Sequence, residues 1–435
     1  MAARQTALSV LIACRRQGAW SDGALKEYIV RDRLDARDAA LASRLCYGVL
    51  QNRALLDFDL ACVVHGGLKK LQPVVLDILR LAAYQILFLD KIPPSAAVNE
   101  AVEQGKRYAN RQAAGLINAA LRTLLREKDS LPQPEDLATR YSHSPELIAL
   151  LTEAVGEEKI ERLLAAHNEA PQLAAQINTL LASTDAVQRE LEGQNIACQR
   201  HPWLPDCLLL QGSGNLERLD AFREGRLYVQ DPAARLAVLC AEPRPGMRVL
   251  DCCAAPGGKS FAAAICMQNE GEILSCDIHA HKLKLIEAGA ARLELSCIRT
   301  MLRDAARAEE TFDGQMDVVL ADVPCSGLGV IRKKPDIREK NLEQIARLPA
   351  LQLAILKHAA RAVKPGGVLL YSTCTILKRE NEEVVAAFLR DMPSFETEAL
   401  PLPEGLTGGE SGCMTLLPCD HGTDGFFLCR LRRKQ

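Results

Sequence analysis

Two cysteines that follow apolar runs are the side chains of this sequence best suited to covalent chemistry. Cys325 lies in the segment DVPCSG (322–327), and Cys374 lies in STCT (372–375). A thiolate is a strong nucleophile, although a lone cysteine after a strand is usually an inert packing residue. Two such cysteines, with Asp322 close to the first of them, predict a nucleophile with helper groups.

A glycine turn after another apolar run predicts a ligand site. The sequence VLDCCAAPGGKS (249–260) runs from a strand pattern through small residues into a helix that begins near Ser260. Small residues let a ligand approach the backbone, and a helix N-terminus offers unpaired N–H groups. A phosphate-binding P-loop is excluded because Cys253 stands where that motif needs glycine. The absence of G-x-G-x-x-G disfavours a dinucleotide site.

Acidic residues follow several of the apolar runs. Asp277, Asp304 and Asp322 each stand at or just after the end of one. A single acid at such a place often only caps the next helix. Three acids at one edge of a sheet favour a ligand site, because ligands of open α/β sheets bind at the carboxyl ends of the strands. Asp277 also has the spacing from the glycine turn that a ribose-binding acid needs.

The elements that position these residues alternate between strand and helix patterns from about residue 232. Strand-like apolar runs occur at 248–251, 271–277, 297–302, 316–322 and 368–372. This alternation predicts a parallel sheet, and in the doubly wound order 3-2-1-4-5 the fourth and fifth strands are neighbours, so both thiols face one cleft. Two further runs, 414–418 and 425–430, joined by the polar residues 420–424, predict an antiparallel hairpin.

The first 129 residues predict an all-α fold. Apolar residues recur with helical spacing in the segments 6–15, 36–52, 73–90 and 95–108. The proline-containing segment LPQP (131–134) predicts a linker. The residues after it mix helix patterns (145–167, 184–192) with a strand pattern (172–178), which predicts a small α+β module.

Charge and composition limit the function classes. Residues 1–130 hold 19 Lys+Arg and 13 Asp+Glu, whereas the whole chain has a net charge of −2. A polyanion is therefore expected to dock on the front half, although ordinary scatter of solvated charge is the alternative. The 16 cysteines form no C-x-x-C pair, which predicts reduced thiols, no metal site and a cytoplasmic location. Nothing in the sequence demands more than a monomer, and no membrane span is expected.

The motifs together resemble the RsmB/NOP family of RNA 5-methylcytosine methyltransferases. The resemblance covers about residues 225–435 and is carried by LYVQDP (227–232), DCCAAPGGK (251–259), PCSG (324–327) and STCT (372–375). In the front half, YGVL (47–50), RLAAYQILFL (80–89) and PPSAAVNE (93–100) resemble the NusB-like RNA-binding domain. The bacterial 16S rRNA enzymes of the family carry that domain ahead of the catalytic domain.

The resemblance implies a multidomain chain that uses S-adenosylmethionine. Its expected parts are an N-terminal all-α NusB-like helical RNA-binding domain over 1–130 and a small α+β linker or RNA-binding module over 135–230. A C-terminal α/β Rossmann-like methyltransferase domain follows over 231–435, with a mixed sheet that ends in an antiparallel hairpin. The implied reaction is methyl transfer to C5 of a specific cytosine in 16S ribosomal RNA, and the implied partner is that RNA, free or partly assembled.

Individual roles also follow from the resemblance. Cys374 would add to C6 of the cytosine, Cys325 would assist release of the product, and Asp322 would lie between the cofactor and the base. Asp322 would hydrogen-bond the N3/N4 edge, preferably as a carboxylic acid. Asp277 would bind the ribose, and Asp304 would lie by the adenine. The other residues expected at the cofactor are Cys253, Ala254, Ala255, Pro256, Gly257, Gly258 and Lys259.

Other functions stay open at this point. The same chemistry on tRNA or 23S rRNA is one alternative, and a catalytically idle RNA-binding factor of ribosome assembly is another. A methyltransferase acting on DNA or protein is disfavoured, because DNA cytosine enzymes carry their nucleophile in the Pro-Cys segment, whereas this chain has a second cysteine after the fifth strand. A small-molecule oxidoreductase is disfavoured by the missing dinucleotide fingerprint.

Overall fold

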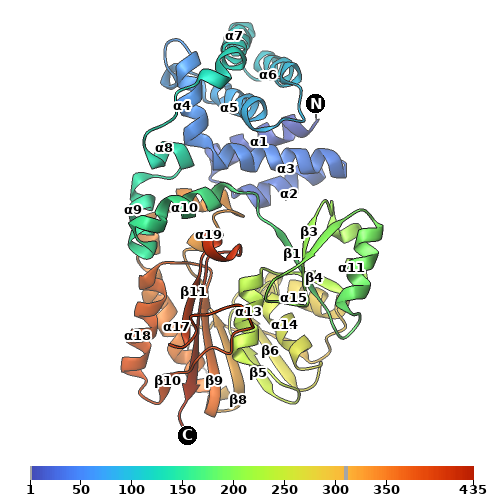
Figure 1. Cartoon of the computed structure of the whole chain (residues 1–435), viewed down its shortest axis with the longest axis vertical. Coiled ribbons are helices and arrows are strands. Elements are labelled where there is room, and N and C mark those ends of the chain that lie inside the picture. Colours follow the sequence, from blue (N-terminus) through green and yellow to red (C-terminus); the bar gives the residue numbers. More distant parts are fainter. Residues whose placement is uncertain (1, 308–311) are drawn as a thin grey trace. The chain divides into compact units, whose positions relative to one another are not determined.

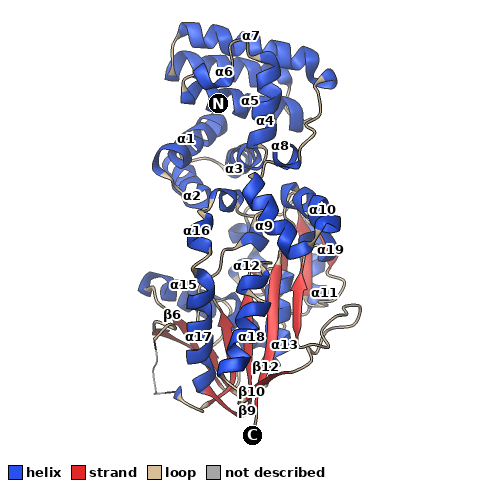
Figure 2. Cartoon of the chain, turned by 90° about the vertical axis from the view of Figure 1, so that its left-hand side faces the viewer, coloured by secondary structure: helices blue, strands red, loops and turns tan. Residues whose placement is uncertain are grey.

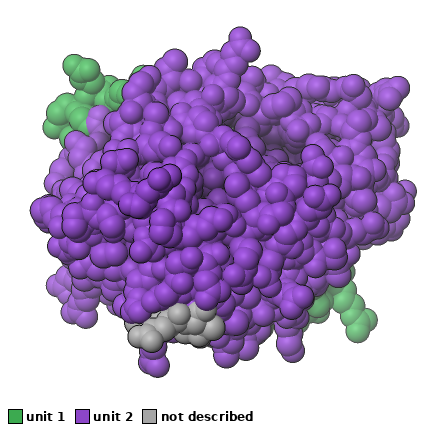
Figure 3. All heavy atoms as spheres, turned by 90° about the horizontal axis from the view of Figure 1, so that it is seen from below, with its two compact units in different colours: residues 1–152, 156–169, 331–339 green, residues 153–155, 170–330, 340–435 purple. Residues whose placement is uncertain are grey.

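The structure is a computed structural model that describes residues 2–307 and 312–435. The chain forms two compact units, coloured separately in Figure 3. The helical unit comprises residues 1–152, 156–169 and 331–339, and the α/β unit comprises 153–155, 170–330 and 340–435. Among the described residues, no helix has both the length and the apolar character needed to cross a membrane.

Helices α1 to α7 pack around one apolar core, as the sequence predicts for the first 129 residues, and three more helices, α8 to α10, follow in the segment that the sequence assigned to the α+β module. The helices are α1 (Ala2–Gln17), α2 (Ser21–Arg31), α3 (Ala36–Gln51), α4 (Arg53–Val63), α5 (Pro73–Phe88), α6 (Pro94–Tyr108), α7 (Arg111–Glu127), α8 (Leu137–Tyr141), α9 (Pro145–Val155) and α10 (Glu157–Asn168) (Figure 1). Helix α5 supplies the centre of the core, where Ile78, Leu79 and Leu81 are almost completely buried. Helices α5 and α6 begin at prolines, which suit the first turn of a helix.

One helix prediction is wrong in this region. The pattern over 145–167 predicts a single helix, but the structure has α9 and α10 with Gly156 between them. The φ angle of Gly156 is +85°, a conformation that favours glycine and ends α9. The apolar spacing continues across the break, so hydrophobic periodicity alone does not reveal it.

A small antiparallel sheet follows and confirms the expected α+β module. Its strands are β1 (Leu173–Ile177), β2 (Ala197–Arg200), β3 (Cys207–Gln211) and β4 (Leu227–Val229), in the order β2-β3-β1-β4, with helices α11 (Thr184–Gly193) and α12 (Asp220–Arg223). Ile177, Val187, Leu191 and Leu208 form part of its core. By contact this sheet belongs to the α/β unit.

The large sheet of the α/β unit has the predicted topology. Its strands are β5 (Arg248–Asp251), β6 (Glu272–Asp277), β7 (Ile298–Leu302), β8 (Met316–Asp322), β9 (Val363–Thr373), β10 (Phe395–Thr397), β11 (Cys413–Leu416) and β12 (Phe426–Arg433). Strands β5 to β9 are parallel and lie in the order β7-β6-β5-β8-β9, which is the expected order 3-2-1-4-5. The fold class inferred from the sequence is thereby confirmed.

Helices cover both faces of this sheet, as Figure 2 shows with strands in red and helices in blue. They are α13 (Pro232–Ala241), α14 (Gly258–Cys266), α15 (Ala280–Arg292), α17 (Leu348–Ala362) and α18 (Glu382–Asp391). The unit also contains the short helices α16 (Leu342–Ile345) and α19 (Pro418–His421). Successive residues of β5 belong to different cores, Val249 to the one under α13 to α15 and Leu250 to the one under α17 and α18. Because both faces of the sheet are buried, the strands are continuous apolar runs in the sequence.

The C-terminal edge is more elaborate than a hairpin. Strands β11 and β12 do pair antiparallel, but β12 also pairs with β9 on one side and with β10 on the other. Residues 418–421, predicted to lie at the end of a strand and in the connecting turn, form the short helix α19. Strand β9 begins at Val363, earlier than the predicted 368, because the pairing of β8 with β9 continues past an irregularity between Met316 and Val318.

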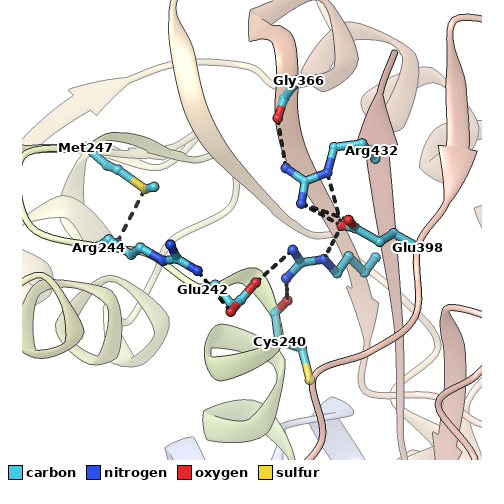
Figure 4. Close-up of polar contacts among 8 residues, drawn as sticks. Cys240, Glu242, Arg244, Met247, Gly366, Glu398 and Arg432 are labelled. Atoms are coloured by element: carbon cyan, nitrogen blue, oxygen red, sulfur yellow. Dashed lines mark hydrogen bonds and ion pairs between the residues drawn. The ribbon is translucent and has the colours of Figure 1, made fainter. Parts of the chain in front are cut away.

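An ion-pair network attaches β12 to its surroundings (Figure 4). Arg430, whose side chain is 4% exposed, pairs with Glu398 at 2.6 Å and with Glu242 at 2.9 Å. Arg432 pairs with the same Glu398 at 2.7 Å and donates to the Gly366 carbonyl oxygen at 2.8 Å. Burial opposes ionisation of Glu398, but the hydrogen bonds and charges of the two arginines outweigh it and lower the pKa of this carboxyl.

The network predicts an acid-sensitive contribution to stability. A carboxyl with a lowered folded-state pKa stabilises the fold above its unfolded pKa, about 4.3, and loses this effect as the pH falls through the folded value. Glu398→Gln should lower the free energy of unfolding by about 1 kcal/mol near neutral pH, because the carboxylate is partly exposed and solvent screens it. The difference from wild type should shrink below about pH 4 in urea unfolding curves. Glu396→Gln, at a 60% exposed side chain 3.9 Å from Lys434, is the control and should change little.

Candidate active site

The glycine turn lies between the end of β5 and the start of α14. Gly257 has a φ of +112°, and a Cβ atom there would come within 2.4 Å of the Phe261 ring. Behind the turn, Ser260 Oγ donates to Asp251 Oδ2 at 2.7 Å and accepts from Ser275 Oγ at 2.7 Å, which ties α14 to β5 and β6. Burial raises the pKa of Asp251 to about 6. These contacts fix the N-terminus of α14 at the carboxyl edge of the sheet.

Asp277 lies at the end of β6, beside two exposed apolar side chains. Its Oδ1 accepts from the His279 backbone N–H at 2.9 Å, and in the β6–β7 register it lies opposite Leu302. Ile278 is 56% exposed and Leu302 is 59% exposed. Two uncovered apolar side chains next to a carboxylate fit a ligand that joins a flat ring to a hydroxylated sugar. Neither residue belongs to a motif of the sequence, although both stand at strand ends near the acids.

The Asp304 carboxylate interacts mainly with the residues that follow it in the chain. Its Oδ1 accepts from the Ala306 backbone N–H at 3.0 Å, and its Oδ2 lies 3.1 Å from Arg307 Nε. It therefore caps the turn after β7, as the alternative interpretation of a strand-end acid predicts. Its side chain keeps 32% exposure at this edge.

Asp322 and Lys259 form an ion pair that joins the end of β8 to the glycine turn. Lys259 Nζ lies 2.6 Å from Asp322 Oδ2, and Ser372 Oγ donates to Asp322 Oδ1 at 2.8 Å. Burial disfavours the ammonium, but the charge and hydrogen bond of Asp322 outweigh it and raise the pKa of Lys259. Both Asp322 oxygens accept hydrogen bonds in this arrangement. The donor role expected from the sequence is therefore not seen in this arrangement, in which Asp322 is an acceptor.

The two motif cysteines are free thiols whose sulfur atoms lie 3.3 Å apart. A hydrogen bond from Cys325, assisted by the charge of Lys259, lowers the pKa of Cys374 although burial and Asp322 act against it. The same hydrogen bond, together with burial, raises the pKa of Cys325 well above its ordinary value. Cys374 is therefore the sulfur prepared to be a thiolate, and Cys325 is the sulfur that keeps its proton.

A buried polar cluster fixes the backbone around both cysteines. Glu380 accepts from the Ser326 backbone N–H at 2.9 Å and from Gln352 Nε2 at 2.8 Å. Gln352 also donates to the Pro324 carbonyl oxygen at 3.0 Å, and Ser326 Oγ donates to Thr375 Oγ1 at 2.7 Å. Cys325 thus lies between Pro324 and Ser326, whose backbone groups are fixed by these hydrogen bonds, and next to the loop of Cys374. Glu380 and Gln352 were not predicted as site residues, because no local pattern in the sequence marks them.

The comparisons with known proteins extend over the whole chain. Residues 238–432 match the family described as 16S rRNA methyltransferase RsmB/F. A probable ribosomal RNA small subunit methyltransferase B of Bacillus subtilis is 37% identical over 442 residues, which cover 99% of this chain and 98% of that protein. This chain belongs to the RsmB/F methyltransferase family. Residues 1–126 match the NusB family, and 143–217 match the ferredoxin-like domain of RsmF/B-like methyltransferases.

Another curated relative and two solved structures are also similar to this chain. The ribosomal RNA small subunit methyltransferase B of Vibrio cholerae is 33% identical, over 92% of this chain and 90% of that protein. The crystal structure of PH0851 superposes with a TM-score of 0.80 at 28% identity, covering 98% of both chains. NSun6 from Pyrococcus horikoshii, solved with the S-adenosylmethionine analogue SFG, has a TM-score of 0.62 at 23% identity, over 67% of this chain and 98% of that one, and shares the fold.

The chain is an S-adenosylmethionine-dependent methyltransferase, and its carboxyl edge fits that cofactor. The exposed Ile278 and Leu302 offer apolar contact to an adenine, and Asp277 offers a carboxylate to ribose hydroxyls. The small residues of the turn and the N-terminus of α14 leave room and N–H donors for the methionine carboxylate. Lys259 forms an ion pair with Asp322, so it lies between the glycine turn and the strand end that leads to Cys325.

Proposed function

We propose that this protein transfers the methyl group of S-adenosylmethionine to C5 of a specific cytosine in 16S ribosomal RNA through a covalent bond between Cys374 and C6. One observation carries the chemistry: the Cys374 sulfur lies 3.3 Å from the Cys325 sulfur. The ion pair of Asp322 and Lys259 connects this thiol pair to the glycine turn. The names of the small-subunit relatives support the RNA.

The first step is addition of the Cys374 thiolate to the ring. A bond forms between Sγ and C6, the C5–C6 double bond opens, and the electron pair moves toward C5 and N3. Asp322 and Lys259 would meet the N3/N4 edge of the base. Lys259, held in place by Asp322, would stabilise the electron density there with its positive charge. The cofactor supplies the methyl group that C5 then accepts.

The second step regenerates the enzyme. C5 now carries both a methyl group and a proton, and the proton must leave before the C5–C6 double bond can re-form and expel Cys374 as a thiolate. Cys325 lies next to the sulfur that departs. While Cys374 is bonded to carbon it is neutral, so the interaction that raised the pKa of Cys325 is lost and Cys325 gives up its own proton to water more readily. The Cys325 thiolate can then take the C5 proton and become a thiol again, while Cys374 leaves as the thiolate. We assign Cys325 to this step.

The RNA-binding roles of the front parts belong to the same proposal. The NusB-like part, taken as 1–130, and the module over 135–230 would hold the RNA around the target cytosine. Because C6 of a stacked base is screened in a duplex, the cytosine must come from a loop or be flipped out. The positive excess of residues 1–130 suits phosphate contacts.

The lowered pKa of Cys374 predicts a pH dependence. Cys374 should react with iodoacetamide at lower pH than a free cysteine, whose pKa is about 8.5. Cys325→Ala removes the hydrogen bond that lowers the pKa, so the alkylation curve of Cys374 should move to higher pH, while Cys325→Ser keeps a donor and should shift it less. Peptide mass spectrometry measures this in the free enzyme. The exposed Cys62, whose pKa burial and nearby acids raise, is an internal reference. Superimposable Cys374 curves for wild type and Cys325→Ala would contradict the assignment.

The substrate is tested by incubating the purified protein with methyl-labelled cofactor and separate pools of 16S rRNA, 23S rRNA and tRNA. Label in 5-methylcytosine from the 16S pool is the expected result, and mapping then gives the position. Label confined to 23S rRNA or tRNA would overturn the substrate, and label in any other nucleoside would overturn the C5 assignment.

A further inference from the structure

Residues 331–339 leave the α/β unit and belong to the helical unit. The chain leaves the α/β unit after Val330 and returns to it at Lys340. This excursion begins six residues after Cys325 and includes the 3-10 helix Pro335–Glu339. The segment that carries a proposed catalytic thiol is therefore continuous with a part of the helical unit.

Arg338 is the main attachment of the excursion. Its guanidinium donates to the carbonyl oxygens of Gln51 at 2.6 Å, of Tyr141 at 3.1 Å and of His167 at 3.1 Å. These residues lie at the C-terminal ends of α3, α8 and α10. Helix C-termini carry partial negative charge and unpaired carbonyl groups, so one cation satisfies three helix ends at once. The residue is only 7% exposed, and burial lowers the pKa of Arg338 to about 9.

Further contacts hold the excursion at other points, among them an ion pair between Glu339 and Arg53 of α4 at 2.7 Å. Asp336 accepts hydrogen bonds from the backbone N–H and the hydroxyl of Ser21, the first residue of α2, and so caps that helix. Gln51 Nε2 donates to the Arg332 carbonyl oxygen at 3.1 Å. The excursion thus supplies an N-terminal cap for one helix and a C-terminal cap for three others. It is an integral part of the helical unit.

The residues on either side of the excursion are held at the cysteines. The Gly329 N–H donates to the Cys374 carbonyl oxygen at 3.0 Å, and the Gly425 N–H donates to the Gly329 carbonyl oxygen at 2.8 Å. A Cβ atom on Gly329 would lie 1.8 Å from the Gly425 carbonyl oxygen, so only glycine fits. After the excursion, Lys340 Nζ donates to the Ser326 carbonyl oxygen at 2.5 Å. Residues at both ends of the excursion therefore form hydrogen bonds with the loops that carry Cys325 and Cys374.

We infer that Arg338 is a positioning residue for methyl transfer, which holds the loop of residues 323–330 so that Cys325 stays against Cys374. The inference rests on the proposed function. The effect passes along the chain: the guanidinium holds residues 331–339 in one conformation, so the two ends of the excursion, Val330 and Lys340, keep a fixed separation. Without this anchor the loop gains freedom, and a displacement of about 1 Å at a catalytic group can cost about a hundredfold in rate.

The test measures rate and adduct together in the full-length protein. Arg338→Met should lower kcat by about tenfold to a hundredfold, leave KM for 16S rRNA within about twofold, and accumulate covalent enzyme–RNA adduct on denaturing gels, because release depends on Cys325. Arg338→Lys keeps a positive charge and should recover part of kcat. Lys334→Met, at an exposed residue of the same excursion, removes a positive charge elsewhere; it is the matched control and should retain kcat. Asp336→Asn, at a separate attachment, should reproduce the effect and replaces Arg338→Met if that variant does not fold.

Three results would overturn the inference. These are a normal kcat in folded Arg338→Met or Asp336→Asn, a rise in KM without a change in kcat, and a loss of rate without adduct. Failure of the proposed function itself looks different, since Cys325→Ala would then give no adduct at all. An adduct in Cys325→Ala with a normal Arg338→Met enzyme would refute only the positioning role.

Discussion

Cys374→Ala should abolish methyl transfer and covalent RNA attachment together. The sulfur is the only atom of residue 374 that can add to C6, and removal of a nucleophile typically costs at least about 10⁴-fold in rate. Without the adduct, C5 is too weak a nucleophile to accept the methyl group. The measurement is incorporation of methyl label into RNA, with a denaturing gel for the adduct.

The control for this variant is another cysteine. Cys62→Ala removes an exposed thiol from α4 and should retain wild-type turnover. Binding of the cofactor by Cys374→Ala should persist, because its expected contacts lie on β6, β7 and α14. A Cys374→Ala enzyme with normal turnover would show that the nucleophile is wrongly assigned.

Cys325→Ala should trap the intermediate instead of preventing it. Cys374 would still add to C6, but the C5 proton would lose the neighbouring acceptor proposed for it, so turnover should fall by about 10²- to 10⁴-fold, the usual contribution of general acid–base catalysis. The enzyme–RNA adduct should then appear as a retarded band that survives denaturation. Methyl label should be present in that band, because transfer precedes release.

The double variant shows whether the trapped adduct is attached through Cys374 or through another residue. Cys325→Ala combined with Cys374→Ala should show no band, since the adduct needs the sulfur at 374. Rapid turnover without a band in the single Cys325→Ala variant would assign proton removal to water or to another side chain. A band that persists in the double variant would refute attachment through Cys374.

Much of the α/β unit could be predicted because parallel strands are short apolar runs between helical patterns. The predicted limits of β5 and β8 agree with the structure, and those of β6 and β7 differ by one residue at the start. The carboxyl ends of such strands lie at one edge of the sheet, so the positions of Asp322, Cys325 and Cys374 in the sequence already predict that they lie close together. The contact between the two sulfurs confirms that both thiols lie at one place.

Other features depend on contacts between distant residues, and no local pattern encodes them. The Glu380 and Gln352 cluster joins segments that are 28 residues apart. Arg338 caps helix ends that lie 170 or more residues away, yet in the sequence it is one more cation in the basic stretch 332–338. The break at Gly156 interrupts a continuous helical pattern. In each case the deciding interaction is tertiary, and periodicity cannot reveal it.

The covalent role of Cys374 can be tested directly with RNA that carries 5-fluorocytosine at the target position. Fluorine at C5 cannot leave as a proton does, so the enzyme should stop after methyl transfer with the nucleotide still attached. Proteolysis and mass spectrometry of the trapped complex should then find the modified nucleotide on the peptide that contains Cys374. A nucleotide attached to Cys325, or no attachment despite active enzyme, would contradict the mechanism.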